Sequence, residues 1–280
     1  MRIDLHTHSV ASDGTDAPAD LLAAAAGAGI DVVALTDHDT TRGWAEAEGA
    51  VARNGVALVR GAEISCRAEG ISVHLLSYLH DPQHPGLLAA AERTRAARLT
   101  RARDIVDRLA EDYALTWADV EEQTVPGTTV GRPHIADALA ALGHVTDRSA
   151  AFSTLLATTS PYYLPHYAPD AEEAVRLVRA AGGVPVMAHP AALMRGRIVT
   201  DRIIEQLVDA GLAGLEVHHR DHDEAQRRRL SELAASSGLL VTGSSDYHGA
   251  GKPNLLGEHT TTPEVLEAIV EQGLLPVIRP

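Results

Sequence analysis

Histidine and carboxylate side chains recur at short spacings along this 280-residue chain, and these residue types are the usual protein ligands of divalent metal ions. His6 and His8 are two residues apart, as are Asp246 and His248, so each pair points to one face if it lies on a strand. The single cysteine, Cys66, excludes a thiolate cluster and an internal disulfide. The groups that we expect to bind metal are His6, His8, Asp13, His38, Glu63, His74, His189, Asp246 and His248.

Short aliphatic runs stand next to these groups and predict the strands that position them. The runs alternate with helical stretches, which is typical of a parallel α/β fold. A closed barrel would gather the metal-binding groups at the carboxyl ends of its strands, whereas an open doubly wound sheet is the alternative. The predicted strands are 3–5, 32–35, 56–59, 73–79, 184–188, 214–217 and 239–242.

The predicted helices divide the chain into two parts. Helices at 18–28, 169–181, 201–210 and 223–236 separate the strands, and glycine follows the last apolar residue of several of them. Between 87 and 159 no strand is expected, because the pattern is helical at 87–113, 117–123, 132–142 and 148–157. We therefore expect a metal-dependent barrel from 1–86 and 160–280, with 87–159 as an inserted helical subdomain that covers the active site.

The charge balance limits the partners. The chain has 24 basic and 38 acidic residues and a formal net charge of −14, which argues against binding long nucleic acid. A small phosphorylated substrate remains compatible, because bound metal reverses the charge locally. No apolar run is long enough for a membrane span and the first residues lack an apolar signal core, so we expect a cytoplasmic protein. Oligomeric state is not predicted.

The ordered motifs DLHTHS, SDGT, TDHDT, GAEIS, the histidine of SVHLL, AHP and SSDYHG resemble those of the PHP (polymerase and histidinol phosphatase) family. The resemblance covers residues 1–257 and implies a distorted seven-stranded (β/α) barrel with a trinuclear metal centre. GRPHIADAL within the insert and AAGGVPVMAHP after it resemble the branch of nucleoside 3′,5′-bisphosphate phosphatases and the short-RNA 5′ exonuclease.

The resemblance also implies how the nine groups hold two or three Mn, Fe or Zn ions. Glu63 would bridge two of the ions, and Asp13 stands where some relatives have histidine. The implied sets are His6, His8, Glu63 and Asp246 for the first ion, Asp13, His38 and His248 for the second, and Glu63, His74 and His189 for the third.

The implied chemistry is hydrolysis of a phosphomonoester by a hydroxide that bridges two metal ions, with Asp13, Glu63 and Asp246 as its carboxylates. The expected substrate is a 3′,5′-bisphosphonucleotide or a nucleoside monophosphate. Histidinol phosphate, another biosynthetic intermediate, C–N bond hydrolysis and a non-catalytic structural role are the alternatives. His219 is a candidate acid for the leaving group, as is Asp39, although Asp37 and Asp39 fit better as supports for the His38 ring.

Other groups are candidates for contacts with the substrate. Arg132 and His134 begin a predicted helix of the insert and are the preferred phosphate ligands, and Lys252 is a further candidate. The arginines of the first insert helix spread around it, so most are expected in solvent, with one of Arg95, Arg98 or Arg101 reaching the pocket. His218 and His219 are adjacent, so at most one of them points inward. No functional role is expected for His80, His84, His144, His166 and His259.

Overall fold

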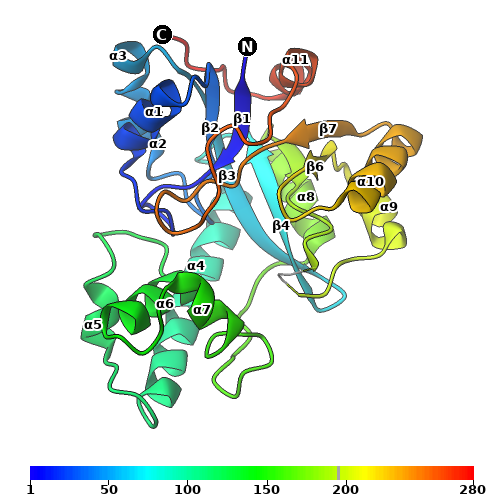
Figure 1. The fold of residues 1–280 in the computed structure, drawn as a ribbon. Helices are drawn as coiled ribbons and strands as arrows, with labels where there is room; N and C mark the ends of the chain where they lie inside the picture. Colours follow the sequence, from blue (N-terminus) through cyan, green and yellow to red (C-terminus); the bar gives the residue numbers. More distant parts are fainter. Residues whose placement is uncertain (194–195) are drawn as a thin grey trace.

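The computed structural model describes residues 1–193 and 196–280, and its strands form one sheet whose spatial order follows the chain (Figure 1). A parallel bridge between Thr7 and Tyr247 joins the first strand to the segment after the last, so the sheet is nearly closed. The predicted distorted seven-stranded barrel is confirmed. The strands are β1 (Ile3–Thr7), β2 (Val32–Leu35), β3 (Ala57–Ala68), β4 (Ile71–Tyr78), β5 (Val184–Met187), β6 (Gly214–His218) and β7 (Leu240–Gly243).

The expectation of a wholly parallel sheet is wrong at β4. This strand is antiparallel to both β3 and β5, and its ladder with β3 runs from Gly61↔Tyr78 to Ala68↔Ile71. The reversal uses a two-residue turn at Glu69 and Gly70, with φ of 48° and 77°. Two consecutive residues with positive φ give the turn whose twist matches a hairpin. As a result β3 continues past Glu63, which lies within a strand rather than at its end.

Helices cover the outside of the barrel and follow the predicted pattern closely. Among the described residues no helix has both the length and the apolar composition that crossing a bilayer requires. Three helices were not predicted, at 44–48, 51–54 and 263–272, and the first two are too short to show a periodic pattern. The helices are α1 (Pro18–Gly27), α2 (Trp44–Glu48), α3 (Val51–Asn54), α8 (Ala171–Ala180), α9 (Asp201–Ala210), α10 (Glu224–Ser237) and α11 (Pro263–Gln272).

The segment between β4 and α8 is helical, as expected, and forms a lobe on one side of the sheet (Figure 1). Residues of this lobe build a hydrophobic cluster of their own, separate from those of the barrel. The boundaries of a subdomain at 87 and 159 stay a prediction. The helices of the lobe are α4 (Pro85–Leu109), α5 (Trp117–Glu121), α6 (Arg132–Ala141) and α7 (Arg148–Ser153).

Candidate metal centre

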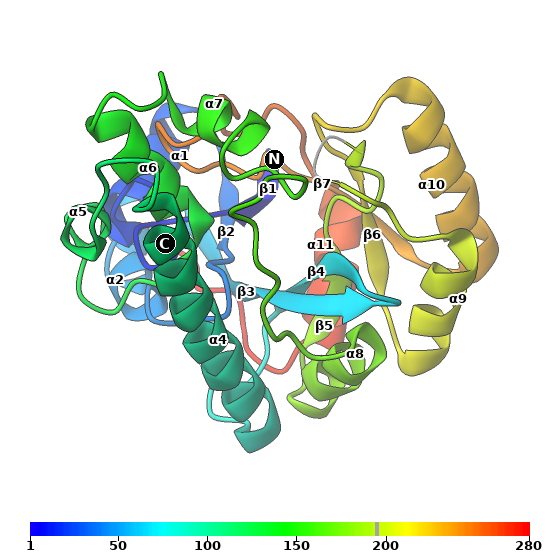
Figure 2. The ribbon, with the colours of Figure 1, turned by 90° about the horizontal axis from the view of Figure 1, so that it is seen from below.

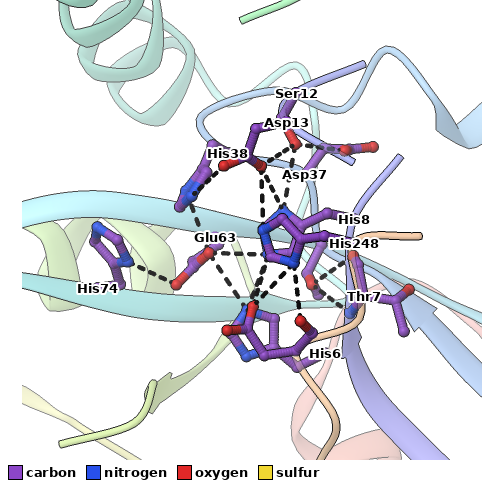
Figure 3. Close-up of polar contacts among 12 residues, drawn as sticks. His6, Thr7, His8, Ser12, Asp13, Asp37, His38, Glu63, His74 and His248 are labelled. Carbon is purple, nitrogen blue, oxygen red and sulfur yellow. Dashed lines mark hydrogen bonds and ion pairs between the residues drawn. The ribbon is translucent and has the colours of Figure 1, made fainter. Parts of the chain in front are cut away.

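The predicted metal-binding groups come together at one end of the barrel (Figure 3). Three of the turns that bring them there have backbone conformations that non-glycine residues rarely adopt. Asp39 after β2, His189 after β5 and Asp246 after β7 have φ of 53°, 32° and 55°. Such conformations persist where the surrounding structure holds them and are concentrated at functional sites.

The tightest arrangement joins the first and last strands to β3. The Nε2 atoms of His6 and His8 are 3.1 Å apart. Glu63 Oε2 lies 3.3 Å and 3.1 Å from these two nitrogens. Asp246 Oδ1 lies 3.4 Å and 3.5 Å from them. Ligand atoms about 2 Å from a common ion are roughly 3 Å apart, so these four atoms have the spacing of a metal site.

The remaining groups surround Glu63 and Asp13. His74 Nδ1 and His189 Nε2 lie 2.7 Å and 3.1 Å from Glu63 Oε1. On the other carboxylate oxygen, His38 Nδ1 is 3.2 Å from Glu63 Oε2. His38 and His248 also approach the two oxygens of Asp13, at 3.7 Å and 3.4 Å. Both oxygens of Glu63 therefore face histidines, which is the position required of a bridging carboxylate.

The nitrogen and oxygen atoms of the cluster are suitable ligands for divalent metal ions. His38 Nδ1 and His248 Nε2 lie 3.2 Å and 3.4 Å from carboxylate oxygens, but these contacts lack hydrogen-bond geometry. Both buried nitrogens therefore have no hydrogen-bond partner among the described residues, although buried ring nitrogens normally have one. A metal ion would supply the missing partner. The compact groups of ligand atoms are His6, His8 and Glu63; His8, Asp13 and His38; His8, Asp246 and His248; and His38, Glu63 and His74.

Burial and charge together determine the protonation of the cluster. Burial raises the pKa of the Glu63 and Asp13 carboxyls, but the surrounding histidines outweigh it and hold both pKa values well below the usual range. Burial lowers the pKa of His248 to about 4, with Lys252 acting in the same direction. Burial would also lower the pKa of His8, but Asp246 and Glu63 raise it to about 9. The carboxylates are therefore ionised and ready to bind cations.

Glu216 on β6 contacts two of the histidines of the cluster. Its Oε1 lies 3.0 Å from His6 Nδ1, and its Oε2 accepts a hydrogen bond of 2.7 Å from the backbone of His189. Burial raises the pKa of Glu216, but His6 lowers it further, to about 2. Of the two adjacent histidines, His219 is buried and His218 is exposed, as the expectation of one inward ring requires.

The aspartates that flank His38 contact neighbouring segments of the chain rather than its ring. Asp37 accepts hydrogen bonds from the Ser9 backbone and the Ser12 hydroxyl, which fixes the loop that carries Asp13 (Figure 3). Asp39 accepts from the backbone and hydroxyl of Ser65 and pairs with Arg98. Asp4, two residues before His6 on β1, accepts mainly from the backbones of Ser245 and Gly257.

The predicted substrate-binding residues occupy different positions around the centre. Lys252 Nζ lies 3.0 Å from Asp246 Oδ2, and His219 Nε2 lies 3.7 Å from the same oxygen. His134 accepts a hydrogen bond from the Gly131 backbone and is buried. Arg132 donates to the carbonyl of Leu156. Their contacts with a substrate stay predictions.

The arginines of α4 divide between solvent and interior. Arg93, Arg103 and Arg108 are exposed, as expected of most of them. Arg98 and Arg101 are buried, with 7% and 6% of their surface exposed. Arg95 donates to the backbone carbonyl of Asp39. Arg101 contacts His166, for which no role was predicted. His166 lies far in the sequence from every strand end, so no spacing pattern could have indicated it.

Comparison with known proteins identifies the family. The PHP domain matches residues 4–123. The 3′,5′-nucleoside bisphosphate phosphatase of Chromobacterium violaceum is 33% identical over 99% of this chain and 98% of its own length. A phosphoribosyl 1,2-cyclic phosphate 1,2-diphosphodiesterase of Eggerthella lenta is 35% identical, over 88% of this chain and 94% of its own.

A solved structure from Bifidobacterium adolescentis, provisionally assigned as a metal-dependent phosphoesterase, superimposes with a TM-score of 0.95 at 44% identity. The alignment covers 97% of this chain and 96% of that one. The chain belongs to the PHP family. It is a hydrolase of the metal-dependent phosphoesterase class.

Proposed function

We propose that this protein is a phosphatase that releases phosphate from a small nucleotide, either a 3′,5′-bisphosphonucleotide or a nucleoside monophosphate. The observation that carries the proposal is Glu63, whose two oxygens face five histidines from four different segments of the barrel. A carboxylate in that position could hold two divalent ions side by side, the arrangement that two-metal phosphatases use. The bisphosphate phosphatase that resembles this chain over nearly its whole length supports the nucleotide as substrate.

Two or three Mn, Fe or Zn ions would be held by the nine His, Asp and Glu groups, divided as the family pattern implies. When bound, they would acidify water and neutralise charge on the phosphoryl oxygens. Asp13, Glu63 and Asp246 contribute about three negative charges and a hydroxide would add one more, so three divalent ions would leave the pocket net positive. This local sign favours a phosphate ester despite the acidic chain as a whole.

Side chains of the protein would orient the substrate and donate a proton to the leaving oxygen. Lys252 and His219 both approach Asp246 Oδ2, so either can meet a phosphate oxygen beside that carboxylate. His219 is the candidate donor of a proton to the leaving oxygen, since its ring is buried next to the cluster. Residues 87–159 form the proposed cover, and they would restrict access to small substrates and exclude long nucleic acid.

Phosphate release from several substrates tests the proposal. Adenosine 3′,5′-bisphosphate, 5′-AMP, histidinol phosphate, a dinucleotide and a simple amide would each be supplied with added Mn²⁺ and again after chelation. We expect metal-dependent release that is fastest from a nucleotide. Faster release from histidinol phosphate would keep the chemistry and discard the nucleotide. Hydrolysis of the amide alone, with metal bound, would refute a phosphatase.

A further inference from the structure

Several arginines lie close together beside the metal centre, and not all of them are paired with a carboxylate. Arg101 is 6% exposed, and the charges of Arg98 and Arg132 act on it most strongly. Burial, together with these two guanidinium groups, lowers the pKa of Arg101 to about 9. Of these arginines, Arg98 is paired with Asp39. Arg101 instead contacts His166, so its charge faces a neutral partner.

The contact between Arg101 and His166 determines which nitrogen of the His166 ring carries a hydrogen. A guanidinium group can only donate, so the nitrogen that faces it at 3.0 Å, His166 Nδ1, must be an acceptor. The ring is therefore neutral with its proton on Nε2. Burial and the charge of Arg101 lower the pKa of His166 to about 2, in agreement with a neutral ring.

Two buried donors consequently lack acceptors. Arg101 Nε and His166 Nε2 are buried, and neither has a hydrogen-bond partner among residues 1–193 and 196–280. Leaving a buried donor unsatisfied is unfavourable, and more so when the donor is charged. Since both orphaned atoms carry hydrogens and the adjacent charges are positive, the group missing from this place is an anion.

Arg101 and His166 lie next to the face of the sheet that carries the metal-binding residues Glu63 and His74. Glu63 and Ser65 are two residues apart on β3 and point to the same face, and Ser65 pairs with His74 on β4. Ser65 Oγ accepts a hydrogen bond from Arg98, which brings α4 onto this face. His74 also acts electrostatically on His166. The segment between α7 and α8, which carries His166, passes across the sheet beside α4 (Figure 2).

Arg132, on α6 of the lobe, adds a third positive side chain near Arg101 and His166. Its guanidinium lies over the rings of Phe152 and Tyr163, at 5.2 Å and 5.3 Å, and donates to the Leu156 carbonyl. These contacts fix its orientation without neutralising its charge, because none of the three partners is a carboxylate. Arg132 therefore adds a pre-oriented positive charge close to that of Arg101.

We propose that Arg101, Arg132 and His166 form a second anion subsite, which binds a phosphate group of the substrate other than the one hydrolysed. The proposal rests on the proposed function. It narrows the substrate to a compound with two phosphate groups, such as a nucleoside 3′,5′-bisphosphate or a 5′-phosphorylated dinucleotide. A nucleoside monophosphate would reach the metal centre without this second anchor.

The test compares kcat/KM for adenosine 3′,5′-bisphosphate and 5′-AMP in the wild type and in Arg101→Gln. Loss of one charged donor should lower kcat/KM for the bisphosphate about 10- to 100-fold, with that for 5′-AMP changed less than about threefold. Arg103→Gln on the exposed face of α4 is the matched control and should behave as the wild type. An equal loss with both substrates, or no wild-type preference for the bisphosphate, would overturn the subsite.

Binding of inorganic phosphate separates this proposal from the proposed function. Calorimetry on chelated protein should show a phosphate site that is weakened at least tenfold in Arg101→Gln and retained in Arg103→Gln. If no substrate releases phosphate but this pattern holds, the function is wrong and the subsite stands. Equal phosphate binding by all three proteins overturns the subsite. Should Arg101→Gln misfold, Arg101→Lys, which keeps the charge but lacks Nε, must still show weaker binding.

Discussion

At the scale of single residues, Glu216 shows how the cluster is held in shape before any ion is present. One oxygen faces the ring of His6 on β1, and the other accepts from the backbone of His189 after β5. The carboxylate thus fixes which nitrogen of His6 points into the centre, because the other nitrogen is occupied. Its low pKa, about 2, keeps it charged throughout the physiological range.

Glu216→Gln should therefore weaken metal binding while leaving the ligands in place. An amide has one acceptor oxygen, so it cannot serve both His6 and the His189 backbone. We expect metal affinity to fall about 10- to 100-fold, as measured by competition with a chromophoric chelator. Glu224→Gln on the exposed start of α10 is the control. Unchanged affinity in Glu216→Gln would show that His6 is oriented by other contacts.

The residue scale is also where prediction from sequence was strongest for ligands and weakest for their supports. Histidines and carboxylates next to aliphatic runs predicted the cluster, because strand ends meet in space. Asp39 was expected to support His38 but pairs with Arg98, which comes from a helix about sixty residues away. The sequence around His166 shows no motif or spacing that would indicate a functional role. Contacts that depend on how a lobe packs against a barrel have no local signature.

At the scale of elements, the β3–β4 hairpin determines where Glu63 and His74 lie. The ladder places Ser65 opposite His74, so Glu63 is one pleat further along the same face. The apolar runs predicted both strands but not the direction of the second. The turn Glu69-Gly70 was the signal that would have shown it, because a two-residue connection cannot join parallel strands.

Gly70→Ala tests the turn. At a φ of 77°, an added Cβ costs about 1 kcal/mol, which in a chain of this size lowers Tm by about 2–4 °C. Gly27→Ala at the end of α1 is the matched control, since nothing lies within 4 Å of its added Cβ. Its Tm should be unchanged or higher. If calorimetry gave both variants the same Tm, the positive φ at Gly70 would not constrain the hairpin.

At the scale of the whole molecule, buried neutral histidines link stability to pH. His80 is 2% exposed, lies against the ring of Trp44 and contacts the Ser77 hydroxyl at 2.8 Å. Burial lowers its pKa from 6.5 to about 4. Below pH 6.5 the unfolded chain takes up a proton that the folded one refuses, so stability is lost as pH falls from 6.5 towards 4.

Between pH 7.5 and pH 5 the wild type should lose about 2 kcal/mol more of its free energy of unfolding than His80→Gln does. Urea unfolding at the two pH values measures the difference. Both proteins are compared in chelator, so that metal release does not contribute. His144→Gln in the lobe should lose as much as the wild type. Parallel pH dependences in wild type and His80→Gln would mean that His80 is not the group responsible.

The sheet is nearly closed by the bridge between Thr7 on β1 and Tyr247 after β7. This closure has a consequence for how the metal site forms during synthesis. Asp246 and His248 emerge from the ribosome 240 residues after His6 and His8. The lobe, whose hydrophobic cluster lies within residues 102–164, can form from neighbouring contacts while synthesis continues. We therefore expect a nascent chain to carry a folded lobe and an open, incomplete ion site. Metal loading then becomes a late event, coupled to arrival of the final strand.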